Sequence, residues 1–98
     1  MKKPATKPVK PKLRPGVAML NEAARTIEER GKVYGDVRPN LERAAVLWTG
    51  VLRRYVTGEQ VALCMIALKM ARLAETPDHA DSITDIAGYA AVYKELVG

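Results

Sequence analysis

The chain has 98 residues, 48% of them hydrophobic, with one cysteine, one histidine and a formal net charge of +5. This length allows a single domain, and no apolar run approaches the roughly 18 residues that a membrane span needs. One cysteine and one histidine cannot build a zinc site or an internal disulfide. No apolar stretch follows the basic start, so a secretory signal is not expected. We therefore expect a protein of a reducing, cytoplasmic compartment.

The positive charge is concentrated in residues 1–15, which contain six basic residues, four prolines and no acidic residue. Residues 16–98 then hold ten basic and eleven acidic residues, a net charge of −1. Because proline fixes φ and lacks an N–H group, residues 1–15 are predicted to form an extended or disordered arm. The arm could contact nucleic acid non-specifically or a host protein, or it could be a solvated tail.

The body, residues 16–98, shows apolar residues three and four apart and no alternating run typical of a strand. This pattern predicts a small all-α bundle of four helices. The first helix is predicted to run from Val17 to Arg30 and to stop at Gly31, a residue suited to the end of a helix. Its predicted buried face consists of Val17, Leu20, Ala24 and Ile27.

The second helix is predicted to start at Asp36 as its cap and to run to about Val56. Pro39 then falls in the first turn, where its missing N–H costs nothing. Apolar side chains recur along this helix at steps of four and three residues, which predicts a stripe that packs on another helix. The stripe consists of Leu41, Ala45, Trp48, Leu52 and Tyr55.

The third helix, about Glu59 to Glu75, is apolar on almost every side, so it is expected to be covered on most sides. It includes Cys64, which is predicted to be a small core residue. A tight turn, with the next helix starting at Thr76-Pro77 or at Asp78, makes the last two helices an antiparallel hairpin. Because 83 residues can form only a small core, so apolar a helix predicts a homo-oligomer.

Four charged residues are predicted to meet across this hairpin. Its register places Lys69 opposite Asp85, and Arg72 opposite Asp81 or Ser82. Charges in an apolar setting need partners. They are either structural ion pairs that fix the register or a polar site that holds a phosphate or a metal.

The two aspartates raise an enzymatic hypothesis. All-α nucleotide pyrophosphohydrolases of the MazG type hold Mg²⁺ against a triphosphate with carboxylates from two helices. Asp81 and Asp85 lie one turn apart and resemble half of such a site, with Mg²⁺ as its cofactor. The third helix offers only Glu59 and Glu75, at its two ends, for the other half.

The segment Tyr34-Gly35-Asp36 is predicted to lie in the link between the first two helices. A tyrosine followed by glycine can present its ring to a base, and Arg38 and Asn40 could contact the phosphates. Tyr34 could instead close the end of the bundle. His79, at the turn before the last helix, could cap that helix, bind a ligand or do neither.

Three segments carry a resemblance that covers roughly residues 17–95. They are Tyr34-Gly35-Asp36, the Lys69-x-x-Arg72 helix and, most specifically, Asp81-Ser82-Ile83-Thr84-Asp85-Ile86-Ala87-Gly88-Tyr89-Ala90. Together they resemble a family of small, mostly phage-encoded helical proteins of unknown function. The same skeleton is similar to the helical-hairpin phage proteins that act as anti-CBASS and anti-Thoeris sponges.

This resemblance implies a non-enzymatic homo-oligomer that binds an intact cyclic oligonucleotide immune signal in the cytoplasm of the bacterial host. Tyr34 matches the tyrosine that stacks on a base in the sponges, and Arg72 matches the hairpin arginine. The sponges also use a lysine on the second helix, a stretch in which this chain has arginines. The predicted ligand-binding set, without any catalytic residue, is Tyr34, Gly35, Arg38, Asn40, Trp48, Arg53, Lys69, Arg72, His79, Asp81 and Asp85.

Two alternatives stay open. One is a Mg²⁺-dependent nucleoside triphosphate pyrophosphohydrolase with Asp81 and Asp85 on the metal. The other is a phage protein that binds a host protein or nucleic acid through residues 1–15.

Overall fold

The computed structural model describes residues 12–98, which form four α-helices and no strand. The helices are α1 (Pro15–Tyr34), α2 (Arg38–Leu52), α3 (Gly58–Glu75) and α4 (Ala80–Val97). The prediction of a small all-α body built on a C-terminal antiparallel hairpin is confirmed. Most of the predicted arm, residues 1–11, lies outside the described residues, and α1 begins at the last residue of that arm.

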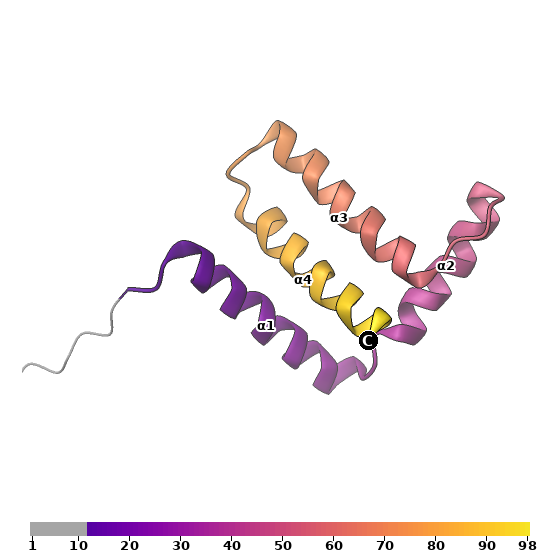
Figure 1. Ribbon diagram of the computed structural model, residues 1–98, viewed down its shortest axis with the longest axis horizontal. Helices are drawn as coiled ribbons and strands as arrows, with labels where there is room; N and C mark the ends of the chain where they lie inside the picture. Colours follow the sequence, from indigo (N-terminus) through magenta and orange to yellow (C-terminus); the bar gives the residue numbers. More distant parts are fainter. Residues whose placement is uncertain (1–11) are drawn as a thin grey trace, which may run out of the picture.

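Three of the helices lie side by side in one layer, with α4 between α1 and α3 (Figure 1). α3 and α4 are antiparallel, whereas α1 runs in the same direction as α4 on its other side (Figure 1). α2 packs on α3 at one end of the layer and then projects away from it. The main buried cluster lies at the α2–α3 contact and consists of Leu41, Ala45, Val61 and Ala62. Val92, Tyr93 and Leu96 extend it onto α4.

The end of α1 differs from the prediction. The helix continues through Gly31 to Tyr34, and Gly35 takes φ 73° while its N–H donates to the Gly31 carbonyl at 2.9 Å. A helix interior tolerates one glycine at a cost of about 1 kcal/mol, but a positive φ favours glycine strongly. Gly35 therefore ends the helix, and Tyr34 is its last residue rather than part of a link.

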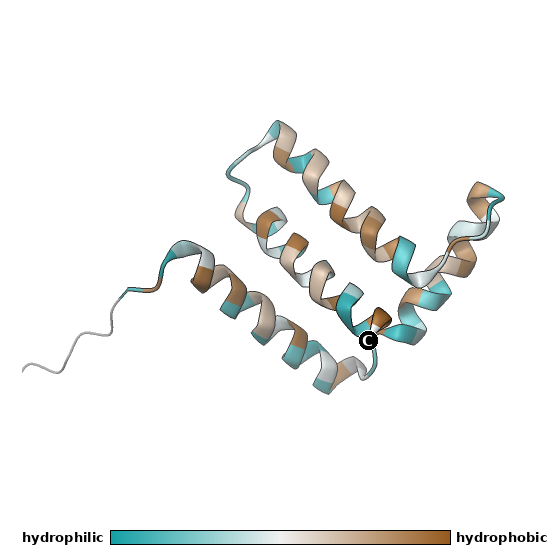
Figure 2. Ribbon diagram, in the orientation of Figure 1, coloured by the Kyte–Doolittle hydropathy of each residue, from teal (hydrophilic) through white to brown (hydrophobic). Residues whose placement is uncertain are grey.

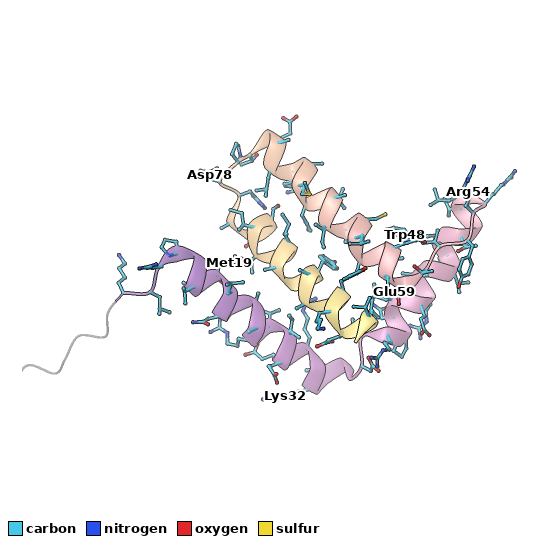
Figure 3. The ribbon with its side chains drawn as sticks, viewed as in Figure 1. Met19, Lys32, Trp48, Arg54, Glu59 and Asp78 are labelled. Atoms are coloured by element: carbon cyan, nitrogen blue, oxygen red, sulfur yellow. The ribbon has the colours of Figure 1, made fainter. Side chains whose placement is uncertain are left out.

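The buried face of α1 also differs from the prediction. Val17, Leu20 and Ala24 are exposed, and Ala23 is the buried residue. Met19 lies between α1 and α4, on the same side of the helix (Figure 3). Because α1 packs on α4 alone in the layer, only a narrow face of it is covered, and small side chains allow the close approach.

The link from α2 to α3 is short and held by side chains. α2 ends at Leu52 because Arg53 adopts a left-handed conformation (φ 55°, ψ 34°). Thr49 Oγ1 then accepts from the Val56 N–H at 2.9 Å. The Thr57 and Gln60 side chains each accept from the other's backbone N–H, a capping box that starts α3.

The predicted stripe of α2 is covered for only half of its length. Leu41 and Ala45 are buried and Trp48 packs against them, whereas Leu52 and Tyr55 are largely exposed. The helix ends before Tyr55 and its second half has already left the layer (Figure 1). In Figure 2 the projecting turns of α2 are coloured largely as hydrophobic.

The hairpin turn is capped by His79, one of the three roles that the sequence left open for it, and not by Thr76, Pro77 or Asp78. The Ser82 N–H donates to His79 Nδ1 at 3.2 Å, and the Ser82 hydroxyl lies 2.7 Å from the same nitrogen. Ser82 is only 1% exposed. The Thr76 carbonyl accepts from the His79 N–H, which places the first three residues of the turn outside the helix.

The apolar third helix is not covered on most sides. Val61 and Ala62 are buried, but Leu63, Leu68 and Met70 are exposed. Cys64 is exposed as well, so its predicted place in the core was wrong. None of the helices within residues 12–98 combines the length and the apolar character needed to cross a membrane.

Candidate functional site

An open hollow of about 1400 Å³ lies between α1, the start of α2 and α4. Four residues of the predicted ligand-binding set line it: Gly35 and Asn40 from the α1–α2 junction, and Asp81 and Asp85 from α4. They are far apart in the sequence. The packing of α1 alongside α4 brings them to one surface.

The two ends of the hollow differ in charge. At the α1–α2 junction it is lined by Arg30, Lys32 and Arg43, with Glu28, Asp36 and Glu95 as the acids of that end. Asp36 is already paired with an arginine outside the lining, which leaves three cations against Glu28 and Glu95, a surplus of one positive charge.

The opposite end is acidic. Because α1 and α4 run in the same direction, the early residues of both helices lie there. Glu22 from α1 and Asp81 and Asp85 from α4 line this end. The hollow therefore offers anion-binding groups at the junction and carboxylates away from it.

Arg38, predicted to bind ligand, ties the start of α2 to the end of α4. Its guanidinium donates to the Glu95 carbonyl at 2.8 Å and to Asp36 Oδ2 at 3.2 Å. Asp36 Oδ1 also accepts from the Arg38 N–H at 3.0 Å. This backbone hydrogen bond, followed by the charge and side-chain hydrogen bond of Arg38, lowers the pKa of Asp36. Arg38 therefore links the start of α2 to the end of α4, and it does not line the hollow.

The predicted ion pairs of the hairpin form in part. Lys69 Nζ lies 3.1 Å from Asp85 Oδ2, as predicted. Arg72 is exposed and pairs with neither Asp81 nor any other carboxylate within residues 12–98. Lys69 therefore holds Asp85 at the edge of the hollow.

The remaining predicted residues lie elsewhere. Trp48 packs on the core, Arg53 is at the exposed end of α2, and His79 caps α4. Tyr34 is the last residue of α1, and its side chain lies outside the described part of the structure. None of the three placed side chains joins the hollow.

Four side chains in the hollow that suit a nucleotide were not predicted to bind ligand: Arg30 and Lys32 from α1, Arg43 from α2 and Tyr89 from α4. Tyr89 is half-buried and occupies the middle of the α4 lining, and Arg43 contributes from α2. Beside the tyrosine, the space next to Gly88 is open, since a Cβ built there would meet no atom within 4 Å. Tyr89 belongs to the most specific run of the sequence, which was the available signal. Arg43 carried no signal because it follows no motif.

The Mg²⁺ hypothesis needs a compact group of carboxylates. Within residues 12–98 no three histidine, cysteine, aspartate or glutamate side chains lie close enough together to hold a metal ion. Asp85, one of the two proposed ligands, is already paired with Lys69. Within residues 12–98, a single chain therefore lacks the compact group of carboxylates that the Mg²⁺ hypothesis needs.

Residues 18–97 match the family described as "Domain of unknown function (DUF6378)", and the chain belongs to this family. It is 47% identical over 70 residues to the Gene 55 protein of Mycobacterium phage L5, and this match covers 69% of this chain and 44% of that protein. It is 42% identical over 85 residues to the Gene 55 protein of Mycobacterium phage D29, and this match covers 82% of this chain and 56% of that protein. The chain spans about half the length of these curated relatives.

No solved structure matches the chain. The predicted resemblance to small helical proteins of phages is confirmed by the family and by these two relatives. The finer similarity to nucleotide sponges stays a prediction.

Proposed function

We propose that this protein binds a nucleotide signal without cleaving it, in the hollow between α1, α2 and α4. The observation that supports this most is the combination of Arg30, Lys32 and Arg43 at one end of the hollow with the half-buried ring of Tyr89 at its middle. Guanidinium groups bind phosphate oxygens through charge-assisted hydrogen bonds, and an aromatic ring stacks on a base. The two chemistries that a nucleotide needs thus share one surface.

The hollow is an open groove of about 1400 Å³, so it leaves room for a dinucleotide or small cyclic oligonucleotide. Such a ligand would place its phosphates at the junction and a base on Tyr89. The acidic end, lined by Asp81, would repel a further phosphate and so fix the orientation of the ligand.

Sequestration, rather than turnover, is proposed because the carboxylates at the acidic end, within residues 12–98, do not gather into a metal-binding group. The relatives encoded by mycobacteriophages support a role in an infected bacterial cell. There, a protein that removes a nucleotide immune signal by binding it would protect the phage from host defence.

The test is equilibrium binding of linear and cyclic di- and trinucleotides, measured by calorimetry with and without Mg²⁺. We expect one class of nucleotide to bind tightly and to be recovered intact by chromatography. Arg43→Gln and Arg30→Gln should each weaken binding roughly 10-fold or more, which is the loss expected for a charged hydrogen bond. Tyr89→Leu should weaken it to a similar extent by removing the stacking ring.

Arg25→Gln is the matched control, because Arg25 is an exposed arginine of the same helix as Arg30 and does not line the hollow. Tyr34→Ala tests the tyrosine that the sponge resemblance implies. Failure of every nucleotide to bind would overturn the proposal. Release of pyrophosphate from a nucleoside triphosphate would replace it with the hydrolase hypothesis.

A further inference from the structure

Gly88 of α4 is a glycine that neither the backbone nor the packing of the described residues requires. It lies in the interior of the helix and does not have a positive φ. Glycine in a helix interior is less favourable than alanine, because its backbone loses more freedom on folding. A Cβ built at Gly88 would meet no atom within 4 Å, so no neighbouring helix needs the missing side chain. Alanine would therefore serve the fold better at this position.

The surroundings of Gly88 differ from those of the other glycines in the helices. Gly58, at the start of α3, is buried, and an α2 side chain lies 3.4 Å from where its Cβ would be. Gly16, Gly31 and Gly50 have open space beside them, but they are exposed. Gly88 is half-buried and still has open space beside it. Because protein interiors are close-packed, this half-buried space indicates room for a group that is not a side chain of the fold.

The open space beside Gly88 belongs to the hollow between α1, α2 and α4. Gly88 lies three residues after Asp85 and four before Val92, and all three line the hollow. Gly88 is therefore in the middle of the α4 face that borders the hollow. Tyr89, the next residue, is half-buried at the side of the same face. A flat group can thus lie over the backbone at Gly88 and against the ring of Tyr89.

The middle of the hollow suits a base better than a phosphate. Ala23 and Ile27, near the middle of α1, line it and are buried and half-buried, respectively. The cations of the lining lie toward the α1–α2 junction instead. Apolar and aromatic groups favour the uncharged face of a base, whereas phosphates need charged donors. The two parts of a nucleotide therefore have separate places along the hollow.

We propose that Gly88 is a specificity-determining residue of the hollow, over which one base of the bound nucleotide lies while it stacks on Tyr89. This inference rests on the nucleotide-binding function proposed above and deepens it. The missing side chain leaves a half-buried space for the base, and a larger residue would occupy that space. Gly88 thus selects a phosphate compound that carries a base, whereas the cations at the junction attract phosphates of any kind.

The first measurement is the thermal stability of Gly88→Ala and Gly88→Leu, with Gly50→Ala and Gly50→Leu as matched controls outside the hollow. Both alanine variants should raise the midpoint of thermal unfolding by about 2–8 °C, since the helix gains and no atom opposes the new Cβ. Circular dichroism should show all four variants to be helical. A Gly88→Ala variant less stable than the natural chain would show that the fold requires this glycine, and would overturn the inference.

The second measurement is calorimetric binding of two probes to the same variants. One probe is the di- or trinucleotide that binds the natural chain most tightly, and the other is tripolyphosphate, which has phosphates but no base. Gly88→Leu should weaken nucleotide binding roughly 5- to 150-fold, the loss of one stacked base, and Gly88→Ala should weaken it less. Tripolyphosphate should bind all variants as it binds the natural chain, and the Gly50 variants should bind the nucleotide normally.

The outcomes separate this inference from the proposed function. Absence of nucleotide binding by the natural chain would overturn both. Tight nucleotide binding that Gly88→Leu leaves unchanged would overturn only the role of Gly88, as would an equal loss of tripolyphosphate binding. Light scattering on the same samples tests a second copy as the occupant of the space. Self-association that Gly88→Leu abolishes, with nucleotide binding unchanged, would assign the space to that copy and overturn the inference.

Discussion

The α3–α4 hairpin and α2 are both rich in apolar residues, but the apolar side chains of the two regions are buried to different extents. α3 packs on α4 along one side and on α2 at one end, whereas α2 is covered only in its first half, where Leu41 and Ala45 meet Val61 and Ala62. The polar contacts differ in the same way. Lys69–Asp85 and the His79–Ser82 cap join the hairpin within the layer, while Arg38 holds only the start of α2. Apolar composition therefore indicates a covered helix without telling which element, or which molecule, covers it.

The largest effect is expected where the covered half of α2 meets α3. Leu41→Ala removes a buried side chain that packs against the backbone at Gly58, and should lower the free energy of unfolding by about 2–5 kcal/mol. Leu47→Ala, on the exposed half, should change it by less than about 0.5 kcal/mol when the chain is monomeric. Urea unfolding measures both. Similar losses of unfolding free energy in the two variants would show that the second half of α2 is buried as well.

A smaller effect is expected at the hairpin turn. His79→Ala removes the group that accepts from the Ser82 N–H, and should cost about 1 kcal/mol of unfolding free energy. His79→Asn should retain most of the stability, because asparagine is a good cap. Thermal unfolding of the two variants measures the difference. An alanine variant as stable as the natural chain would mean that the cap does not hold the turn.

The Lys69–Asp85 ion pair of the hairpin should contribute less to the free energy of unfolding than the His79 cap does. Its side chains are partly exposed, at 26% for Lys69 and 45% for Asp85, so solvent screens the attraction. A double-mutant cycle with Lys69→Met and Asp85→Asn should give a coupling of about 0.2–1 kcal/mol. The same cycle with Arg72→Met and Asp81→Asn should give no measurable coupling, since those two side chains are not paired with each other.

The smallest expected effect concerns the acid dependence of the α2 junction. Folding lowers the pKa of Asp36 from its usual value of 3.8, so the ionised carboxylate stabilises the fold. This contribution is fully present above pH 3.8 and is lost as the pH falls through the folded pKa. Unfolding free energy measured below about pH 4 should therefore fall more steeply for the natural chain than for Asp36→Asn. Parallel curves would show that Arg38 does not stabilise the charged form.

Much of the fold followed from periodicity, because the helices and the hairpin depend on patterns within one or two turns. The ends of the helices followed less well. Gly31 was expected to end α1, but Gly35 ends it. The sequence alone does not distinguish a glycine that a helix tolerates from one that a positive φ requires. His79 took the place expected for Thr76 or Asp78 because the tight turn needs those residues outside the helix.

The hollow could be predicted only in part. Gly35, Asn40, Asp81 and Asp85 carried local signals, but only the adjacency of α1 and α4 brings them together. That adjacency joins helices separated in the sequence by all of α2 and α3, and no short-range pattern encodes it. Trp48 was predicted both as part of the packing stripe of the second helix and as a ligand-binding residue, and it packs on the core.

The central place of α4 in the layer bears on the order of folding. α1 is synthesised first, but the helix on which it packs follows after two intervening helices. The α3–α4 hairpin, made of neighbours in sequence, can close quickly, and its closure creates the surface that α1 needs. During synthesis on the ribosome, the narrow apolar face of α1 therefore stays exposed until α4 has emerged. The hollow is completed in the same step, because residues of both α1 and α4 line it.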